Sequence, residues 1–165
     1  MPTNVLVTGG AGFLGRFIVD AILEKHQDWT ITVFDLVGPG HARSNVRYEV
    51  GDVTVDSSVR SVIRKAEPCA IIHAAGIVPE LAERYGRRLE AQVFRANVEG
   101  TRNMLAAAKD HGVEAFVWTG SCTAVTDDMN REYRNIDEAV PTSKQSLVYG
   151  ESKVRATFSL SQCQD

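Results

Sequence analysis

Tyr149 and Lys153 are the residues of this sequence whose types and spacing most directly suggest acid–base chemistry. They stand four positions apart, so in a helix both side chains would lie on one face. A phenol with a pKa of about 10 is a poor base at neutral pH, and an adjacent ammonium group favours the phenolate and lowers that pKa. Tyr149 could then take a proton from the hydroxyl group of a small molecule. The same spacing also arises by chance on solvated helix faces, so a second signal is needed.

That second signal is a glycine-rich turn, Thr8–Gly15, which follows the apolar run at 4–7. Gly9 allows the chain to reverse tightly, Gly12 allows the backbone to approach a ligand, and Gly15 allows the next helix to pack closely on a sheet. A helix that begins after such a turn directs free N–H groups and a partial positive charge at an anion. The pattern predicts a site for the pyrophosphate of a dinucleotide.

Asp35 ends the apolar segment at 30–35 and stands twenty positions after Gly15. At about this spacing, dinucleotide sites carry an acid that binds the hydroxyl groups of the adenosine ribose. Because a carboxylate accepts two hydroxyl donors and repels a 2′-phosphate, Asp35 favours NAD over NADP. The nearest basic residue downstream is Arg43. The alternative interpretation of Asp35 is a solvated carboxylate at a strand end.

Strands and helices alternate along the chain, which predicts an α/β fold: a Rossmann-type, doubly wound parallel sheet covered on both faces. We expect strands at 4–8, 30–35, 46–50, 69–73 and 114–119, and helices at 13–25, 56–66 and 87–110. A further helix would carry Tyr149 and Lys153, and Gly112 is a predicted C-cap. The region 120–148 is polar and irregular, as segments that carry function often are.

Bulk properties are those of a single α/β domain. The chain has 165 residues and a net charge of −3, which gives no reason to expect nucleic acid or acidic membranes as partners. The longest apolar run, at 70–78, is too short to span a bilayer, which takes about 20 residues. No targeting segment is visible, and Cys69, Cys122 and Cys163 suggest reduced thiols in the cytoplasm, with neither a disulfide framework nor a metal site.

Six blocks of residues stand in the order typical of a known superfamily. They are Thr8–Gly15, Asp35, Gly51-Asp52-Val53-Thr54, His73-Ala74-Ala75-Gly76, Asn97-Val98-Glu99-Gly100-Thr101 and Tyr149-Gly150-Glu151-Ser152-Lys153. From residue 4 to about residue 158 the chain resembles the extended short-chain dehydrogenases/reductases. Within that group it is most similar to the 3β-hydroxysteroid dehydrogenase and sterol-4α-carboxylate 3-dehydrogenase branch.

The resemblance implies a set of cofactor-binding residues. Asp52 would contact the adenine ring, with a role as a cap or turn carboxylate as its alternative, and the small residues of 74–76 would lie along the ribose. His73 is expected to be a packed histidine at a strand end rather than a catalyst. The whole expected set is Gly9, Gly12, Phe13, Leu14, Gly15, Asp35, Asp52, Val53, Ala74, Ala75, Gly76, Asn97, Tyr149 and Lys153.

The resemblance also implies catalytic roles. Tyr149 would be the acid/base, and Lys153 would activate it and hold the nicotinamide ribose. Asn97 would support the lysine through water, with an ordinary polar helix position as its alternative. The family places a serine where this chain has Cys122, and a thiol is a weaker hydrogen-bond donor. Either Ser121 or Thr123 is therefore expected to bond the reacting oxygen.

The implied function is an NAD-dependent oxidoreductase of the 3β-hydroxysteroid dehydrogenase type, which oxidises a secondary alcohol of a sterol-like small molecule. Two alternatives stay open. One is a nucleotide-sugar epimerase or dehydratase, or a ketone reductase, of the same superfamily. Thr126 weighs against the sugar enzymes, because they commonly carry tyrosine and glycine after the position of Val125. The other alternative is a non-catalytic NAD-binding module.

Relatives of this branch continue with further strands and a C-terminal substrate-binding portion. We therefore expect 1–165 to be an NAD(P)-binding Rossmann domain that is incomplete at its C-terminus. It would bind NAD weakly, lack most of the substrate pocket and turn over poorly. The strand at 114–119 would be left at an exposed sheet edge, which favours aggregation. A homodimer through the helices that begin near Leu89 and Tyr149 is a further expectation.

Overall fold

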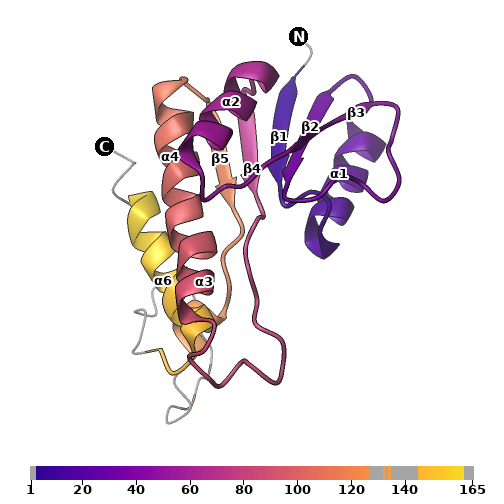
Figure 1. The fold of residues 1–165 in the computed structure, drawn as a ribbon. Coiled ribbons are helices and arrows are strands. Elements are labelled where there is room, and N and C mark those ends of the chain that lie inside the picture. Colours follow the sequence, from indigo (N-terminus) through magenta and orange to yellow (C-terminus); the bar gives the residue numbers. More distant parts are fainter. Residues whose placement is uncertain (1–2, 127–131, 133, 135–144, 162–165) are drawn as a thin grey trace.

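The computed structural model describes residues 3–126, 132, 134 and 145–161 (Figure 1). The strands are β1 (Asn4–Thr8), β2 (Thr30–Asp35), β3 (Val46–Val50), β4 (Ala70–His73) and β5 (Ala115–Trp118). The helices are α1 (Phe13–Lys25), α2 (Asp56–Ala66), α3 (Glu90–Phe94), the π-helical turn η1 (Arg95–Glu99), α4 (Gly100–Asp110), α5 (Thr123–Thr126) and α6 (Val148–Ser161). The expected alternation of strands and helices is confirmed.

The strands form one parallel sheet in the order β3-β2-β1-β4-β5. The chain leaves β1 toward β2 on one side and later returns to β4 on the other. The strand order therefore reverses between β1 and β4, and parallel α/β sheets bind ligands beyond the carboxyl ends of the strands at such a point. Thr8, the last residue of β1, lies in register with both Phe34 and His73 there. The Rossmann-type fold is thereby confirmed.

Both faces of the sheet are covered, because side chains alternate between them along each strand. Leu6, Phe34 and Ile71 pack against α2 and α4 on one face. The neighbouring positions, among them Val7 and Val33, pack against α1 on the other. Figure 1 shows α2, α4 and α6 on one side of the molecule, with α6 alongside α4.

The predicted helix at 87–110 differs from the structure in its start and its regularity. Helical backbone begins at Glu90 and runs to Asp110, but five of its residues, Arg95–Glu99, form the π-helical turn η1. Such turns widen a helix locally and often occur at functional sites. Gly112 follows the helix with a φ of 67°, as expected of a residue that ends one.

The C-terminal part of the fold agrees in outline with the sequence. β5 is an edge strand, as predicted, and Val117 on its α1 side is 54% exposed. α6, the predicted helix that carries Tyr149 and Lys153, has 14 residues, about four turns. Most of the region 120–148 and Cys163 lie outside the described residues, and the short helix α5 forms within that region. In the described part of the chain, no helix has the length and apolar character needed to cross a membrane.

Candidate functional site

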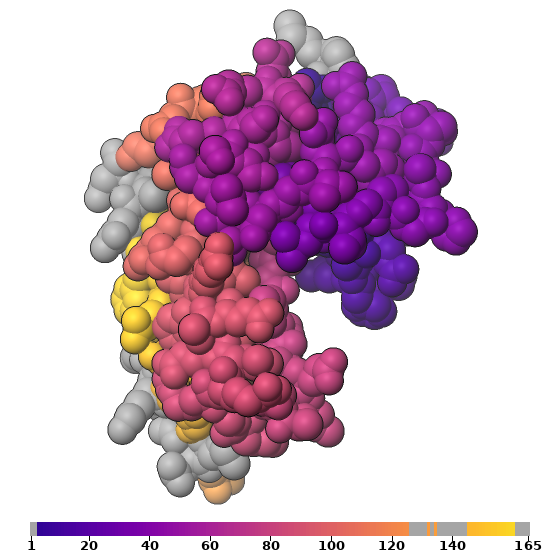
Figure 2. All heavy atoms as spheres, in the orientation of Figure 1, coloured from indigo at the N-terminus to yellow at the C-terminus, as the bar shows by residue number. Residues whose placement is uncertain are grey.

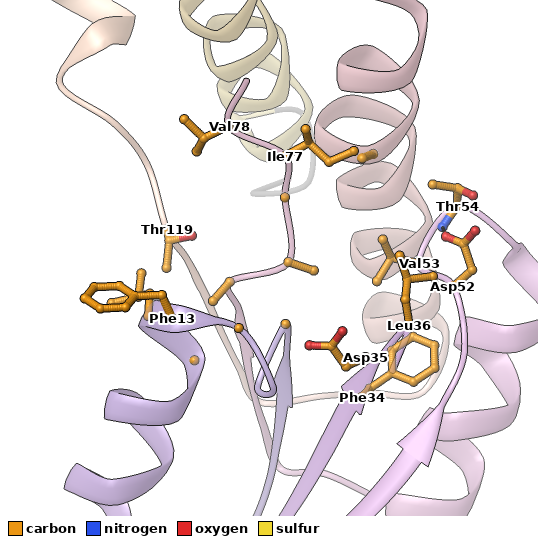
Figure 3. Close-up of a pocket in the computed structure, with 18 of the residues that line it drawn as sticks. Phe13, Phe34, Asp35, Leu36, Asp52, Val53, Thr54, Ile77, Val78 and Thr119 are labelled. Atoms are coloured by element: carbon orange, nitrogen blue, oxygen red, sulfur yellow. Dashed lines mark hydrogen bonds between the residues drawn. The ribbon is translucent and has the colours of Figure 1, made fainter. Parts of the chain in front are cut away.

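A cleft of about 660 Å³ opens beyond the carboxyl ends of the strands. Figure 2 shows the molecule hollowed between the indigo N-terminal part and the pink segment that follows β4. Figure 3 shows Asp35 and Asp52 beside this space, with Phe13, Ile77 and Thr119 around it. Of the residues expected to bind a cofactor, all except Asn97 line the cleft: Gly9, Gly12, Phe13, Leu14, Gly15, Asp35, Asp52, Val53, Ala74, Ala75, Gly76, Tyr149 and Lys153.

The glycine turn is packed too closely for side chains at several of its positions. Gly9 has a φ of 70°, and a Cβ there would stand 2.7 Å from the backbone nitrogen of Ala75. A Cβ on Gly15 would collide with the carbonyl oxygen of Gly9, so this glycine lets α1 approach the turn itself rather than the sheet. Among the described residues no side chain caps α1, whose first turn also lacks an acid. The free N–H groups therefore suit an anion such as a pyrophosphate.

Asp35 has a structural contact that the sequence did not reveal. Its Oδ2 atom accepts a hydrogen bond from the backbone N–H of Ala11 at 3.0 Å. This bond joins the end of β2 to the middle of the glycine turn. Its other carboxylate oxygen, Oδ1, bonds no residue in the described ranges and so can accept a hydroxyl donor from a ligand. The arrangement fits the predicted role beside an adenosine ribose.

Asp52 and Val53 follow β3 along the wall of the cleft. Asp52 Oδ1 accepts a hydrogen bond from the Thr54 N–H at 2.8 Å, which is the turn role considered for this carboxylate from the sequence. Val53 packs on Gly100, where a Cβ would lie 2.7 Å from Val53 Cγ2. Gly100 thus brings the helix close to the adenine side of the predicted cofactor site. The Thr54 hydroxyl oxygen is buried here without a partner among the described residues.

Asn97 lies in the π-helical turn and is buried. Its side-chain Oδ1 accepts from the Ile77 N–H at 2.7 Å, and its Nδ2 donates to the Ile77 carbonyl at 3.0 Å and to Ser152 Oγ at 3.0 Å. The amide therefore holds the backbone that follows β4 and connects it to α6. A Cβ on Gly76 would stand 3.0 Å from Asn97 Oδ1, so the segment fits tightly. Asn97 acts from behind the cleft wall and does not line the cleft.

Tyr149 lies on α6 beside the turn that follows β5. Burial has the largest effect on the pKa of Tyr149 and raises it. A hydrogen bond with the Ser121 side chain lowers this pKa, and the electrostatic effect of Cys122 raises it. The net direction is upward. The depression expected from Lys153 therefore does not set the pKa of Tyr149. Of the two hydroxyl groups proposed from sequence, Ser121 contacts Tyr149, and Thr123 Oγ1 bonds Ser121 Oγ at 2.8 Å.

Lys153 is buried and held between α6 and the end of β5. Its Nζ atom donates to the Thr119 carbonyl oxygen at 2.9 Å and lies 4.9 Å from the centroid of the Trp118 ring. The Tyr149 ring centroid is 5.7 Å away. Burial lowers the pKa of Lys153 to about 8, because the charged form loses its hydration. With this pKa, most Lys153 side chains still carry a proton at pH 7.

Several residues of the site are not among the candidate cofactor-binding and catalytic residues named from the sequence. Thr101 donates to the Asn97 carbonyl oxygen and Ser152 accepts from the Asn97 side chain, while Trp118 lies beside the Lys153 ammonium group. The cleft is also lined by Phe34, Leu36, Gly51, Thr54, Ile77, Val78, Gln92, Arg95, Ala96, Thr119 and Gly120. Most of them stand at or shortly after the end of a strand, and this position in the sequence could have identified them as residues of a ligand site. Gln92 and Arg95 belong to α3 and η1, and no local motif marks them.

Comparison with known proteins agrees with this geometry. The family model of the 3-beta hydroxysteroid dehydrogenase/isomerase family matches residues 6–160. A 3-beta-hydroxysteroid dehydrogenase of Mycolicibacterium neoaurum is 34% identical over 160 residues, which are 93% of this chain and 41% of that protein. The decarboxylating sterol-4-alpha-carboxylate 3-dehydrogenase of Schizosaccharomyces pombe is 29% identical, over 94% of this chain and 44% of its own.

A solved structure shows the same fold with a dinucleotide. The UDP-glucose 4-epimerase of Thermus thermophilus, in complex with NAD, superposes with a TM-score of 0.80 at 27% identity, over 96% of this chain and 50% of that one. This chain thus spans half or less of the length of the proteins compared here. The strand order, the glycine turn and the matched family model lead to one assignment: the chain belongs to the 3-beta hydroxysteroid dehydrogenase/isomerase family, within the short-chain dehydrogenases/reductases.

Proposed function

We propose that this chain forms the dinucleotide-binding part of an NAD-dependent oxidoreductase that oxidises a secondary alcohol. One observation carries the proposal: a single cleft is lined by the glycine turn, by Asp35, and by Tyr149 and Lys153. An anion site and an acid–base pair thereby share one cavity. That combination suits hydride transfer coupled to proton transfer.

Each residue of the pair has a defined part in the proposed reaction. Bound NAD would supply the hydride acceptor. Tyr149 would exchange a proton with the substrate oxygen, and Ser121 would orient the phenol through their hydrogen bond. Because burial raises its pKa, Tyr149 holds its proton at neutral pH in this chain, so it is ready as the acid for ketone reduction and must lose that proton to act as the base. Lys153 would hold the nicotinamide ribose and favour the phenolate.

The proposed substrate is a sterol-like alcohol. The names of the two curated relatives support this substrate class. Val78 adds support, because this apolar residue lines the cleft and is 56% exposed. We further propose that the protein works in the cytoplasm, where the thiol groups of Cys69 and Cys122 would stay reduced.

A second candidate is a nucleotide-sugar epimerase of the same superfamily. The likeness to the Thermus thermophilus UDP-glucose 4-epimerase favours it, and bovine UDP-glucose 4-epimerase is 30% identical over 93% of this chain. The acid–base chemistry of Tyr149 and Lys153 suits both reactions, so the two candidates differ in which class of substrate is turned over.

Titration with NADH tests the shared part of both proposals. The chain has two tryptophans. Trp118 lies beside Lys153, whereas Trp29 stacks on His26 just after α1. In a Trp29→Phe variant NADH should still quench the remaining fluorescence, and in a Trp118→Phe variant that response should disappear. A folded Trp29→Phe protein whose emission ignores NADH would contradict NADH binding near Trp118.

Turnover of sterols and nucleotide sugars separates the candidates. Sterol oxidation that falls by about a hundredfold or more in Tyr149→Phe, with NADH binding retained, supports the oxidoreductase. Epimerisation of a UDP-sugar without sterol oxidation favours the second candidate. NADH binding without any turnover favours the non-catalytic module.

A further inference from the structure

His73, at the end of β4, is fully buried and lies between two threonines. Its Nδ1 atom is 2.6 Å from Thr8 Oγ1, and its Nε2 atom is 3.1 Å from Thr101 Oγ1. Thr8 ends β1 and Thr101 lies in α4, so the imidazole connects the sheet to the helix above it. The centroid of the Phe116 ring lies 6.0 Å from that of the imidazole, and the Lys153 charge acts on the imidazole.

The surrounding hydrogen bonds determine which ring nitrogen carries the proton. The Thr101 hydroxyl donates its only proton to the Asn97 carbonyl oxygen at 2.7 Å, so toward His73 it can only accept. Nε2 must therefore be the protonated nitrogen. Nδ1 then has no proton and accepts from the Thr8 hydroxyl, whose oxygen in turn accepts the Ala75 N–H at 3.1 Å. Every donor in this series has an acceptor.

The series reaches the wall of the proposed cofactor cleft at one end and the backbone behind that wall at the other. At one end is the Ala75 amide, and Ala75 lines the cleft. At the other is the carbonyl group of Asn97, whose side chain holds Ile77 and bonds Ser152 Oγ. Ser152 Oγ donates to the Tyr149 carbonyl oxygen at 2.7 Å, which extends the connection into α6.

We propose that His73 is a positioning residue, whose neutral imidazole with the proton on Nε2 sets the place of the Ala75 amide and of the π-helical turn around the cofactor cleft. If Nδ1 were protonated as well, the Thr8 hydroxyl would face two donors, the imidazole N–H and the Ala75 N–H, and would have no acceptor for its own proton. Burial lowers the pKa of His73 to about 3, so the neutral form persists across the pH range in which the protein would work. The inference rests on the proposed function only in that the cleft is taken to bind NAD.

The tautomer can be measured in the protein without any cofactor. Nitrogen-15 NMR of the imidazole should show one protonated nitrogen, Nε2, and one unprotonated nitrogen, Nδ1, with no change between pH 8 and pH 5. A proton on Nδ1, or titration of the ring in that interval, would overturn the proposal.

Two substitutions at Thr101 test positioning. Thr101→Ser keeps the hydroxyl group, whereas Thr101→Val keeps the shape and leaves Nε2 without its acceptor. The backbone amide signals of Ala75 and Ile77 should move in Thr101→Val and stay in place in Thr101→Ser. The Kd for NADH should rise about tenfold in Thr101→Val alone, because a displaced Ala75 amide would fit the cofactor less well; a tenfold change corresponds to about 1.4 kcal/mol of binding free energy. The thermal unfolding midpoint of each variant is measured first, and the comparison is made well below the lower midpoint, where both variants are folded.

The outcomes separate the two proposals. A folded Thr101→Val protein with unmoved Ala75 and Ile77 signals and unchanged NADH affinity would mean that the contact only stabilises the fold, and the positioning role would be lost. Absence of NADH binding in the wild-type chain would instead defeat the proposed function. The NMR measurements would still decide the role of His73, because they need no cofactor.

Discussion

The Lys153 ammonium group donates to the Thr119 carbonyl oxygen 2.9 Å away, and this bond joins α6 to the residue that follows β5. The two residues are 34 positions apart in the chain, so only the folded structure brings them together. The contact keeps a charged group in a buried place, where burial lowers its pKa to about 8. Because this pKa differs from that of a lysine in the unfolded chain, the free energy of unfolding depends on pH.

The first prediction concerns Lys153→Met. Between pH 8 and about 10.5 the unfolded chain binds a proton that the folded chain has lost, so the free energy of unfolding of the wild type should rise with pH in this window. The rise should total up to about 3 kcal/mol. In the Lys153→Met variant this rise should disappear. Urea unfolding across the window measures it, with Lys109→Met, an exposed lysine of α4, as the control that should keep the rise.

The second prediction separates the two parts played by Asp35. Asp35→Asn keeps an oxygen acceptor for the Ala11 N–H and removes the negative charge. Without the charge a 2′-phosphate is no longer repelled, so the ratio of NADPH to NADH affinity should rise about tenfold. Asp35→Ala should weaken both cofactors, because the glycine turn loses its support. Asp52→Asn is the matched control. A ratio that moves equally in Asp35→Asn and Asp52→Asn would count against the ribose role of Asp35.

The third prediction concerns the tight contact within the glycine turn. A Cβ on Gly15 would collide with the Gly9 carbonyl oxygen, whereas a Cβ on Gly38 would meet nothing within 4 Å. Gly15→Ala should lower the free energy of unfolding by about 1–3 kcal/mol and weaken NADH binding. Gly38→Ala should change neither quantity. Urea unfolding and NADH titration give both results, and equal effects of the two substitutions would refute the steric argument.

The fourth prediction concerns the proton of Tyr149. The Ser121 hydrogen bond lowers the pKa of this phenol, so in Ser121→Ala the pKa should rise further. The Cys122 charge acts in the opposite direction, so in Cys122→Ser the pKa should fall. Carbon-13 NMR of the tyrosine ring over an alkaline titration follows both changes. Shifts in the same direction would show that the two neighbours do not act on Tyr149 as assigned.

Much of the part of the fold around the glycine turn was predictable because its signals are local. The turn Thr8–Gly15 lies between a strand and a helix, and Asp35 ends the next strand, so adjacent residues carry the whole pattern. The parallel sheet followed from the alternation of short apolar runs and helical segments. Periodicity could not reveal the π-helical turn at Arg95–Glu99, because it arises where Asn97 bonds Ile77, 20 positions away.

The sequence by itself determined which groups could do chemistry: the phenol of Tyr149, the ammonium of Lys153 and the anion site of the glycine turn. Tertiary structure decided how these groups behave. It brought the Ser121 side chain, rather than that of Thr123, into hydrogen bonding with Tyr149, and it placed Asn97 behind the cleft wall. It also raised the pKa of Tyr149, which the spacing to Lys153 alone had suggested would fall. The physical reason is that hydration and hydrogen bonding depend on which distant segments surround a group, and only packing sets those neighbours.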